Sequence, residues 1–168
     1  QPWDVNYASE KLRIERYALS EEELKPYFPL ERAMAGLHAL TERVFGVKLV
    51  ERSGVDLWHK DARCFDLVDA RGEAFAVVYF DLFARSGKRG GAWMDVAQSR
   101  KRIGALQRPH AFLTCNFAPP TPELPSLLTH DDLLTLLHEF GHGLHHLLTE
   151  IDYPSLSGIE GVEWDAVE

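Results

Sequence analysis

The stretch from residue 129 to residue 148 constrains the fold of this chain more than any other part of its sequence. It opens with a helix-start pattern, in which Thr129 can cap the helix N-terminus and the acidic Asp132 follows three residues later. A leucine-rich run then continues to about Leu148. The pattern predicts one long helix late in the chain, and that helix carries the most informative motif of the sequence.

This motif is H-E-x-x-H, formed by residues 138–142. Residues four apart lie on one face of a helix, so His138 and His142 can present two imidazoles to one tetrahedral Zn²⁺. Glu139 lies beside that face and can take a proton from a water that attacks a carbonyl. The motif therefore predicts a zinc-dependent hydrolase. The structural alternative is a helix with two surface or hydrogen-bonded histidines.

A catalytic zinc site needs a third protein ligand. The metzincin extension is absent, because it requires Gly and His where this chain has His145 and Leu148. A downstream carboxylate is then needed, but Glu150 lies two turns along the same helix and Asp152 lies in a loop. A second helix, expected from about Ile159, can return antiparallel and aim a carboxylate at the metal. Spacing does not choose among its acidic residues, which are Glu160, Glu163, Asp165 and Glu168.

Helix and strand signals follow one another in blocks, which predicts an α+β fold. Residues 8–18 and 30–45 have helical patterns, and Gly46 fits the residue that ends the second helix. Residues 70–73 fit a hairpin turn. The expected strands, rich in Val, Phe and Tyr, are Val47–Val50, Arg63–Asp69, Ala74–Phe80 and His110–Phe117.

Composition excludes several classes of protein. With 168 residues, of which 45% are hydrophobic, the chain can bury a core and is not a disordered polymer. Its 26 acidic and 18 basic residues argue against a nucleic-acid partner, because phosphate binding needs a basic surface. No apolar run approaches the roughly 20 residues of a membrane-spanning helix, so no membrane partner is expected. Cys64 and Cys115 lie in apolar strand sequence and are expected to be reduced, buried thiols.

The ends of the chain suggest a piece of a longer protein. It begins with Gln1 rather than an initiator Met, and it stops at Glu168 without a turn or a polar tail. We therefore expect part of a larger unit, in which apolar surface exposed here is covered. Such surface would give the isolated chain an oligomeric state without physiological meaning.

Several short stretches together are more specific than H-E-x-x-H alone. They are H-E-F-G-H-G-L-H at 138–145, S-G at 157–158, V-E-W-D-A-V-E at 162–168, F-D-L-F-A-R at 80–85, K-R-G-G-A-W at 88–93 and C-N-F at 115–117. With this combination the chain resembles, over nearly its whole length, the thimet-oligopeptidase (M3) family of zinc peptidases. Within the family it is most similar to the bacterial oligopeptidase and dipeptidyl carboxypeptidase branches.

The resemblance implies a zincin-like (gluzincin) fold, in which a small β-sheet packs with helices and H-E-x-x-H lies on a long helix of a larger, mostly helical peptidase. It also implies that the third zinc ligand is Glu168, the last residue of the V-E-x-D-x-V-E pattern. One Zn²⁺ per chain would then be held by His138, His142 and Glu168. Glu139 would be the general base and proton shuttle.

The same resemblance implies a cytoplasmic enzyme that cleaves short peptides inside a deep channel. Residues 1–168 would be a partial catalytic domain, helical over 1–46, β-rich over 47–117 and carrying the zinc-site helices over 129–168. Family members place further substrate-binding groups after the third ligand, so the isolated chain is expected to be poorly active. The pattern fits both endopeptidase and dipeptidyl carboxypeptidase action. The alternative from another class is a non-catalytic helical interaction or scaffold domain with incidental histidines.

Four further residues near the motif have expected roles. Asp165 or Glu163 can accept the second N–H of a ligating histidine, as carboxylates commonly do in zinc sites. His145 and His146 follow the motif on roughly the same side of the helix. They are expected to be surface groups or supports of the ligands.

Two segments of the middle of the chain are expected to form the cleft. The glycines of the loop Gly87–Gly91 fit either a plain hairpin loop or a loop whose backbone comes close to a cleft. The family resemblance favours the loop that lines the cleft. The strand Ala111–Phe117 is predicted to be a sheet edge, to which an extended substrate would add as a further strand.

Overall fold

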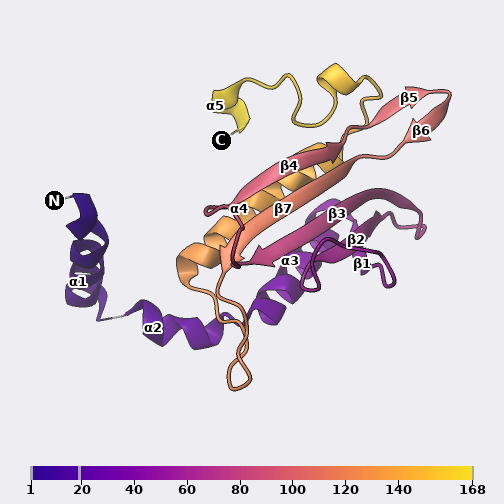
Figure 1. The fold of residues 1–168 in the computed structure, drawn as a ribbon. Coiled ribbons are helices and arrows are strands. Elements are labelled where there is room, and N and C mark those ends of the chain that lie inside the picture. Colours follow the sequence, from indigo (N-terminus) through magenta and orange to yellow (C-terminus); the bar gives the residue numbers. More distant parts are fainter. Residues whose placement is uncertain (1, 19, 168) are drawn as a thin grey trace.

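The computed structural model describes residues 2–18 and 20–167, which form a mixed α+β structure around one twisted sheet (Figure 1). The α-helices are α1 (Val5–Tyr17), α2 (Glu21–Leu24), α3 (Leu30–Phe45), α4 (His130–Leu147) and α5 (Trp164–Val167). Short 3-10 helices are η1 (Pro2–Asp4), η2 (Lys25–Tyr27) and η3 (Pro154–Leu156). The strands are β1 (Lys48–Glu51), β2 (Arg63–Val68), β3 (Ala74–Phe83), β4 (Trp93–Gln98), β5 (Lys101–Ile103), β6 (Ala105–Gln107) and β7 (His110–Phe117).

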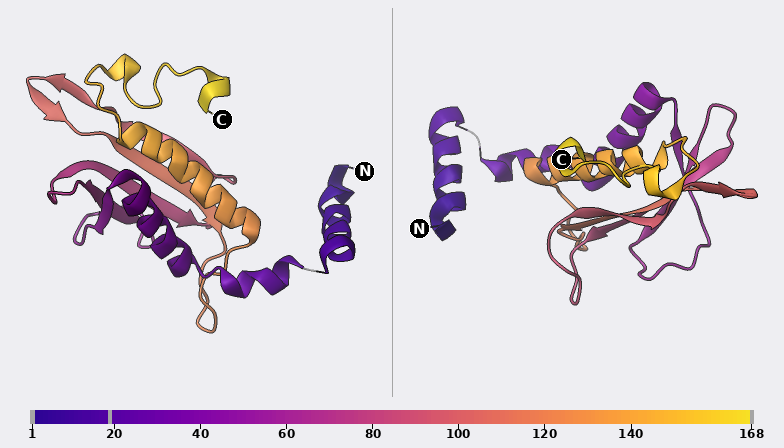
Figure 2. Two further views of the ribbon diagram at one scale, coloured as in Figure 1. Left: turned by 180° about the vertical axis from the view of Figure 1, so that it is seen from behind. Right: turned by 90° about the horizontal axis from the view of Figure 1, so that it is seen from above.

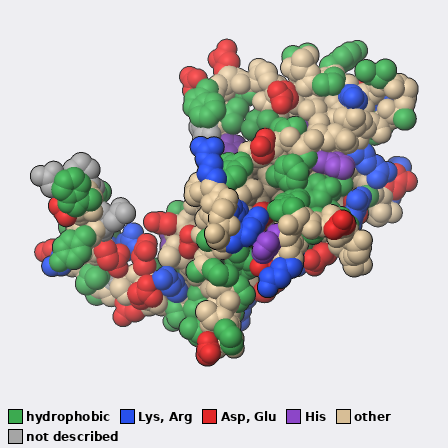
Figure 3. Space-filling view, in the orientation of Figure 1, with side chains coloured by type: hydrophobic (Ala, Val, Ile, Leu, Met, Phe, Trp, Pro, Cys, Tyr) green, Lys and Arg blue, Asp and Glu red, His purple; other side chains and the backbone are tan. Residues whose placement is uncertain are grey.

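The first helix, α1, stands away from the sheet (Figures 1 and 2). Its apolar side chains Leu12, Ile14 and Tyr17 are exposed, and hydrophobic side chains are visible on it in the space-filling view (Figure 3). An ion pair of 2.6 Å between Arg13 and Glu21 connects it to α2. The helix is therefore formed where the sequence predicted it, but its apolar face is not buried among the described residues.

The sheet has the strand order β1-β2-β3-β7-β4. Strands β3 and β7 are parallel, and the other neighbours are antiparallel. Strand β7 therefore lies inside the sheet, and the prediction that it forms an edge is wrong. The edge strand beside β7 is β4. After β3 the chain leaves the sheet and then returns as β4 on the outer side of β7. The pair β5–β6 forms a separate two-stranded hairpin.

The core lies between the sheet and the two helices α3 and α4, which pack on one of its faces (Figure 2). Helix α3 ends at Gly46, whose φ of +68° is the left-handed conformation that glycine adopts readily. Helix α4 presses Phe140 onto Phe80 of β3, with ring centroids 5.9 Å apart. This packing fixes the helix that carries H-E-x-x-H against the middle of the sheet.

The start of α4 is set by its predicted cap. The Thr129 hydroxyl accepts a hydrogen bond from the Asp132 backbone N–H at 2.9 Å, and the Asp132 carboxylate accepts one from the Thr129 N–H at 2.9 Å. This reciprocal pair satisfies two N–H groups that a helix start would otherwise leave without partners.

Two other expectations about elements need correction. The last helix begins at Trp164 rather than near Ile159, because Ser157–Gly161 forms a turn in which both glycines have positive φ. Strand β4 and the β5–β6 hairpin were not predicted from the sequence. None of the described helices has the length and apolar content that a membrane crossing requires.

Candidate active site

The two histidines of the motif converge on one point beside α4. Their Nε2 atoms lie 3.0 Å apart, and their ring centroids lie 4.5 Å apart in an edge-to-face arrangement. A tetrahedral zinc ion with Zn–N bonds of ordinary length holds two nitrogens about 3.3 Å apart. The positions of His138 and His142 therefore fit a pair of zinc ligands.

These histidines open into a cavity of about 400 Å³ with three walls. One wall is α4, which contributes Glu139 along with the histidine pair. The second wall is the start of the edge strand β4, and the third is the C-terminal segment. The residues that line the cavity are Ala92, Trp93, Met94, His138, Glu139, His142, Ile159, Trp164 and Val167.

Cys115 of β7 lies buried on the sheet side of this site. Burial, and next the negative charge of Glu139, raise the pKa of the Cys115 thiol to about 12. The thiol is thus protonated at neutral pH and is a poor nucleophile or metal ligand. Cys64 is also buried, and neither cysteine forms a disulfide, as the sequence predicted.

The loop between β3 and β4 is fixed by a buried carboxylate, Asp81, which is 6% exposed. The Arg85 guanidinium contacts both of its oxygens at 2.6 and 2.7 Å, and Trp58 Nε1 donates to it at 2.9 Å. Lys88 Nζ, itself buried, donates to Asp81 Oδ1 at 2.9 Å and to the Asp81 and Phe83 carbonyls at 2.8 Å. Burial alone would raise the pKa of Asp81, but these hydrogen bonds outweigh it and hold the pKa well below its ordinary value.

The same loop is held a second time, close to the site. Asn116 Nδ2 donates to the Arg89 and Gly91 carbonyls at 2.8 and 2.6 Å. Residues 92–94, which follow directly, line the cavity. Residues 87–91 are not among those that line the cavity of the histidines, but Lys88 and Arg89 line a neighbouring cavity of about 340 Å³ together with Trp93. The loop positions the residues that line the cavity of the histidines.

The C-terminal wall is held differently. Asp152 forms ion pairs of 2.8 Å with Arg100 and with Arg102, next to the β5–β6 hairpin. Hydrogen bonds from Arg102 and then Arg100 lower the pKa of Asp152. Its carboxylate is thus engaged away from the histidines, which argues against Asp152 as a ligand.

The other candidate carboxylates are placed as follows. The described residues contain no group of three or more His, Cys, Asp and Glu side chains arranged to hold a metal. Glu150, Glu160, Glu163 and Asp165 are exposed and do not complete such a group with the histidine pair. Glu168 lies outside the described residues.

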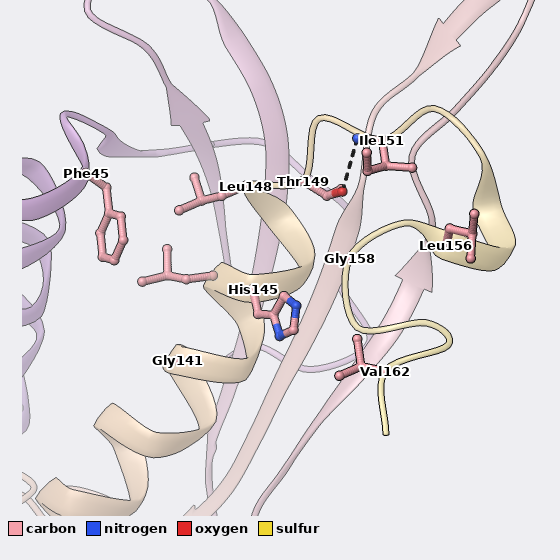
Figure 4. A pocket seen from close by; sticks show the side chains of 10 residues that line it. Phe45, Gly141, His145, Leu148, Thr149, Ile151, Leu156, Gly158 and Val162 are labelled. Atoms are coloured by element: carbon pink, nitrogen blue, oxygen red, sulfur yellow. Dashed lines mark hydrogen bonds between the residues drawn. The ribbon is translucent and has the colours of Figure 1, made fainter. Parts of the chain in front are cut away.

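The two histidines that follow the motif on α4 do not join the pair. His145 is exposed and lines a second cavity of about 700 Å³, where its ring lies on the side of α4 that faces Gly158 and Val162 (Figure 4). His146 is fully buried. The cavity residues that the sequence reasoning missed are Trp93 and Met94. Their only local signal was the mainly apolar content of residues 93–96.

Comparison with known proteins identifies the family of the chain. Residues 1–168 match peptidase family M3 along their whole length. The chain is 53% identical to oligopeptidase A of Escherichia coli over 170 residues, which cover 100% of this chain and 25% of that protein. It is 52% identical to oligopeptidase A of Haemophilus influenzae over 169 residues, with 99% and 25% covered. It is 39% identical to the dipeptidyl carboxypeptidase of Escherichia coli over 159 residues, with 94% and 23% covered.

The family match thus gives the class of the protein, which is a family of peptidases. The chain belongs to peptidase family M3, and the family assignment made from its sequence motifs is confirmed. It spans about a quarter of the length of the curated relatives that it matches.

Proposed function

We propose that this chain supplies the zinc site of a peptidase that hydrolyses short peptides. The observation that carries the proposal is the convergence of His138 Nε2 and His142 Nε2, 3.0 Å apart, in a cavity that Glu139 also lines. The family match supports it and removes the reason to prefer a scaffold domain with incidental histidines. The relatives named oligopeptidase A support short peptides as substrates.

In this proposal His138, His142 and Glu168 hold one Zn²⁺. The two imidazoles have the required spacing, and the M3 pattern supports Glu168 as the third ligand. Val167, the residue before Glu168, lines the same cavity as the histidines. When bound, zinc supplies a Lewis acid that polarises the scissile carbonyl and acidifies water.

The protein side chain that acts on protons is Glu139. It accepts a proton from the attacking water and delivers it to the leaving amine, so that one carboxylate serves both halves of the hydrolysis. Cys115, protonated beneath it, takes no part. The reaction breaks the C–N bond of the peptide and adds the elements of water across it.

The peptide is proposed to bind along β4. Among the described residues β4 pairs only with β7, so its other edge has N–H and C=O groups available to an extended chain. The first residues of β4 line the cavity. A peptide paired there would pass the histidines, which replaces the earlier expectation that β7 is the docking edge.

The test uses the natural polypeptide that contains this sequence and an internally quenched peptide. Glu139→Gln should retain zinc but lose turnover by roughly a hundredfold or more. His138→Ala should lose both zinc and turnover. His145→Ala is the matched control, because this exposed histidine of the same helix should be dispensable. Full turnover by Glu139→Gln, or absence of zinc from the unaltered protein, would contradict the proposal.

We propose that the 168-residue chain alone is a poorly active piece of a larger enzyme. We also propose that this enzyme is cytoplasmic. The same quenched-peptide assay on the isolated chain measures the first point. Turnover close to that of the longer polypeptide would show that residues 1–168 need no other substrate-binding groups.

A further inference from the structure

A buried histidine joins α4 to the edge strand of the sheet. His146 lies one helical turn after His142 and is fully buried. Its Nε2 atom lies 3.0 Å from the Gln98 carbonyl at the end of β4. A carbonyl oxygen only accepts hydrogen bonds, so Nε2 carries a proton. In the neutral ring Nδ1 is then an acceptor.

Two buried polar atoms meet at this place without partners. Neither His146 Nδ1 nor Ser157 Oγ has a hydrogen bond among the described residues, although both side chains are fully buried. Buried polar groups are rarely left in this state. The two atoms are complementary, because the imidazole nitrogen needs a donor and the serine hydroxyl can donate.

The backbone next to Ser157 packs directly on the imidazole. Gly158 has a φ of +66°, and a Cβ atom added to it would lie 2.5 Å from His146 Nδ1 and 2.8 Å from His146 Cα. Only a glycine fits such an approach. Figure 4 shows Gly158 on the segment that passes beside α4. Ser157 is therefore held at the imidazole by its neighbour.

The segment that follows, as far as it is described, is held mainly by local hydrogen bonds. Between residues 153 and 167, all the hydrogen bonds of the described residues are local, such as Ser157 N–H to Pro154 O and Ala166 N–H to Glu163 O. Yet Ile159, Trp164 and Val167 form the third wall of the candidate site. A bond at Ser157 would connect this wall to α4.

We propose that the Ser157 hydroxyl, after a rotamer change, donates a hydrogen bond to His146 Nδ1. His146 then links the end of β4 to the 157–167 segment and positions that segment, with the V-E-x-D-x-V-E pattern, beside the histidine pair. His146 and Ser157 are positioning residues that touch neither substrate nor metal. This inference rests on the proposed function for its purpose, but the bond itself is a property of the folded chain.

A double-mutant cycle in the natural polypeptide tests the bond. Zinc affinity is measured by competition with a chromophoric chelator for Ser157→Ala, His146→Leu and the double variant. Each single change should weaken zinc binding about tenfold, as loss of supporting contacts does in zinc sites. The double variant should bind zinc no more weakly than the single variant with the lower affinity, since both changes remove the same bond between Ser157 and His146. If the loss of zinc affinity in the double variant equals the product of the losses in the two single variants, the proposal is overturned.

Two further variants separate positioning from core filling. His146→Gln has an amide that can donate to Gln98 O and accept from Ser157, so it should stay within about threefold of the unaltered zinc affinity. Ser155→Ala removes an exposed hydroxyl from the same segment and should change nothing. If His146→Gln binds zinc as weakly as His146→Leu, the hydrogen bonds of His146 do not account for its effect, and the proposal is overturned.

A measurement on metal-free protein distinguishes this inference from the proposed function. Ser157→Ala should speed hydrogen–deuterium exchange of the amides in 157–167 about tenfold, with Ser155→Ala at the unaltered rate. If the protein neither binds zinc nor cleaves peptides, the proposed function fails, while faster exchange would still support the bond. If it does both and Ser157→Ala leaves exchange and zinc affinity unchanged, the bond is refuted and the function stands.

Discussion

Besides α4, the candidate site has two walls, one on the sheet side at β4 and one formed by the C-terminal segment, and they are built in opposite ways. The sheet-side wall follows the β3–β4 loop, where Asp81 gathers two cations and an indole N–H in the protein interior. The C-terminal wall has ion pairs at Asp152 nearer the surface, one part-buried and one exposed, and beyond them mostly local hydrogen bonds among the described residues. The difference indicates that the sheet-side wall is fixed by the fold alone, whereas the other wall depends on a few contacts and on whatever the site binds.

The largest expected effect comes from Asp81→Asn. The variant leaves the buried ammonium of Lys88 without its counter-charge, which costs about 3 kcal/mol or more when one partner of a buried ion pair is lost. Urea unfolding measures this change in the free energy of unfolding. Asp66→Asn is the control, because its partner Arg52 is more exposed. Equal losses for the two variants would contradict the buried-clamp interpretation.

The pH dependence of stability sharpens the same point. The pKa of Asp81 is lower in the folded chain than its ordinary value of 3.8, so its carboxylate stabilises the fold fully above that pH. The contribution declines as the pH falls below 3.8 toward the folded-state pKa. The difference in unfolding free energy between the unaltered chain and Asp81→Asn should therefore be constant from pH 7 to about pH 5 and shrink below pH 4. A difference that grows with acid would contradict the shift.

The next effect belongs to the C-terminal wall. Gly158→Ala forces a Cβ against His146, and Gly104→Ala makes the same change at a φ of +80° with no atom within 4 Å. The control should cost about 1 kcal/mol from left-handed backbone strain, and Gly158→Ala about 2 kcal/mol or more. Because this wall can open locally, the change should appear as faster amide exchange in 157–167. Equal behaviour of the two variants would show that the close approach to His146 is unimportant.

These two walls also mark where sequence reasoning succeeded. The helix 30–45 and the strand His110–Phe117 were predicted with the bounds that the structure shows, because strong local signals flank them. Gly46 ends the first, and a proline-rich stretch follows the second. The helix of the motif was predicted from its cap for the same reason. Where the chain's own signals decide, the prediction was confirmed.

Sequence reasoning failed where distant pairing decides. Strand β4 is short, and it forms because it pairs with β7. Because β7 also pairs with β3, in parallel, β4 and not β7 is the edge of the sheet. The helix expected near Ile159 gives way to turns at Gly158 and Gly161. Within the site, the spacing of His138 and His142 predicted their meeting, but Trp93 and Met94 follow only from the topology.

A smaller effect is expected at the start of the C-terminal wall. Asp152→Asn removes one part-buried ion pair, with Arg100, and one exposed ion pair, with Arg102, and such pairs near the surface contribute little to global stability in water. It should speed amide exchange in 149–156 less than Gly158→Ala speeds it in 157–167. The difference from the unaltered chain should shrink in 1 M salt, where the screening length falls to about 3 Å. A salt-independent effect would mean that Asp152 acts through packing.

The smallest expected effect is a change in the labelling rate of Cys115, which lies on the sheet side of the site. This rate allows the two walls to be compared directly. Burial raises the pKa of its thiol, so a thiol reagent should not label it at pH 8 in the folded chain. Gly158→Ala should leave this protection unchanged, because only the C-terminal wall loosens. Asp81→Asn should raise the labelling rate roughly tenfold or more, because the sheet-side wall loses its clamp. If Gly158→Ala exposes the thiol as much as Asp81→Asn does, the walls do not move independently and the contrast between them is wrong.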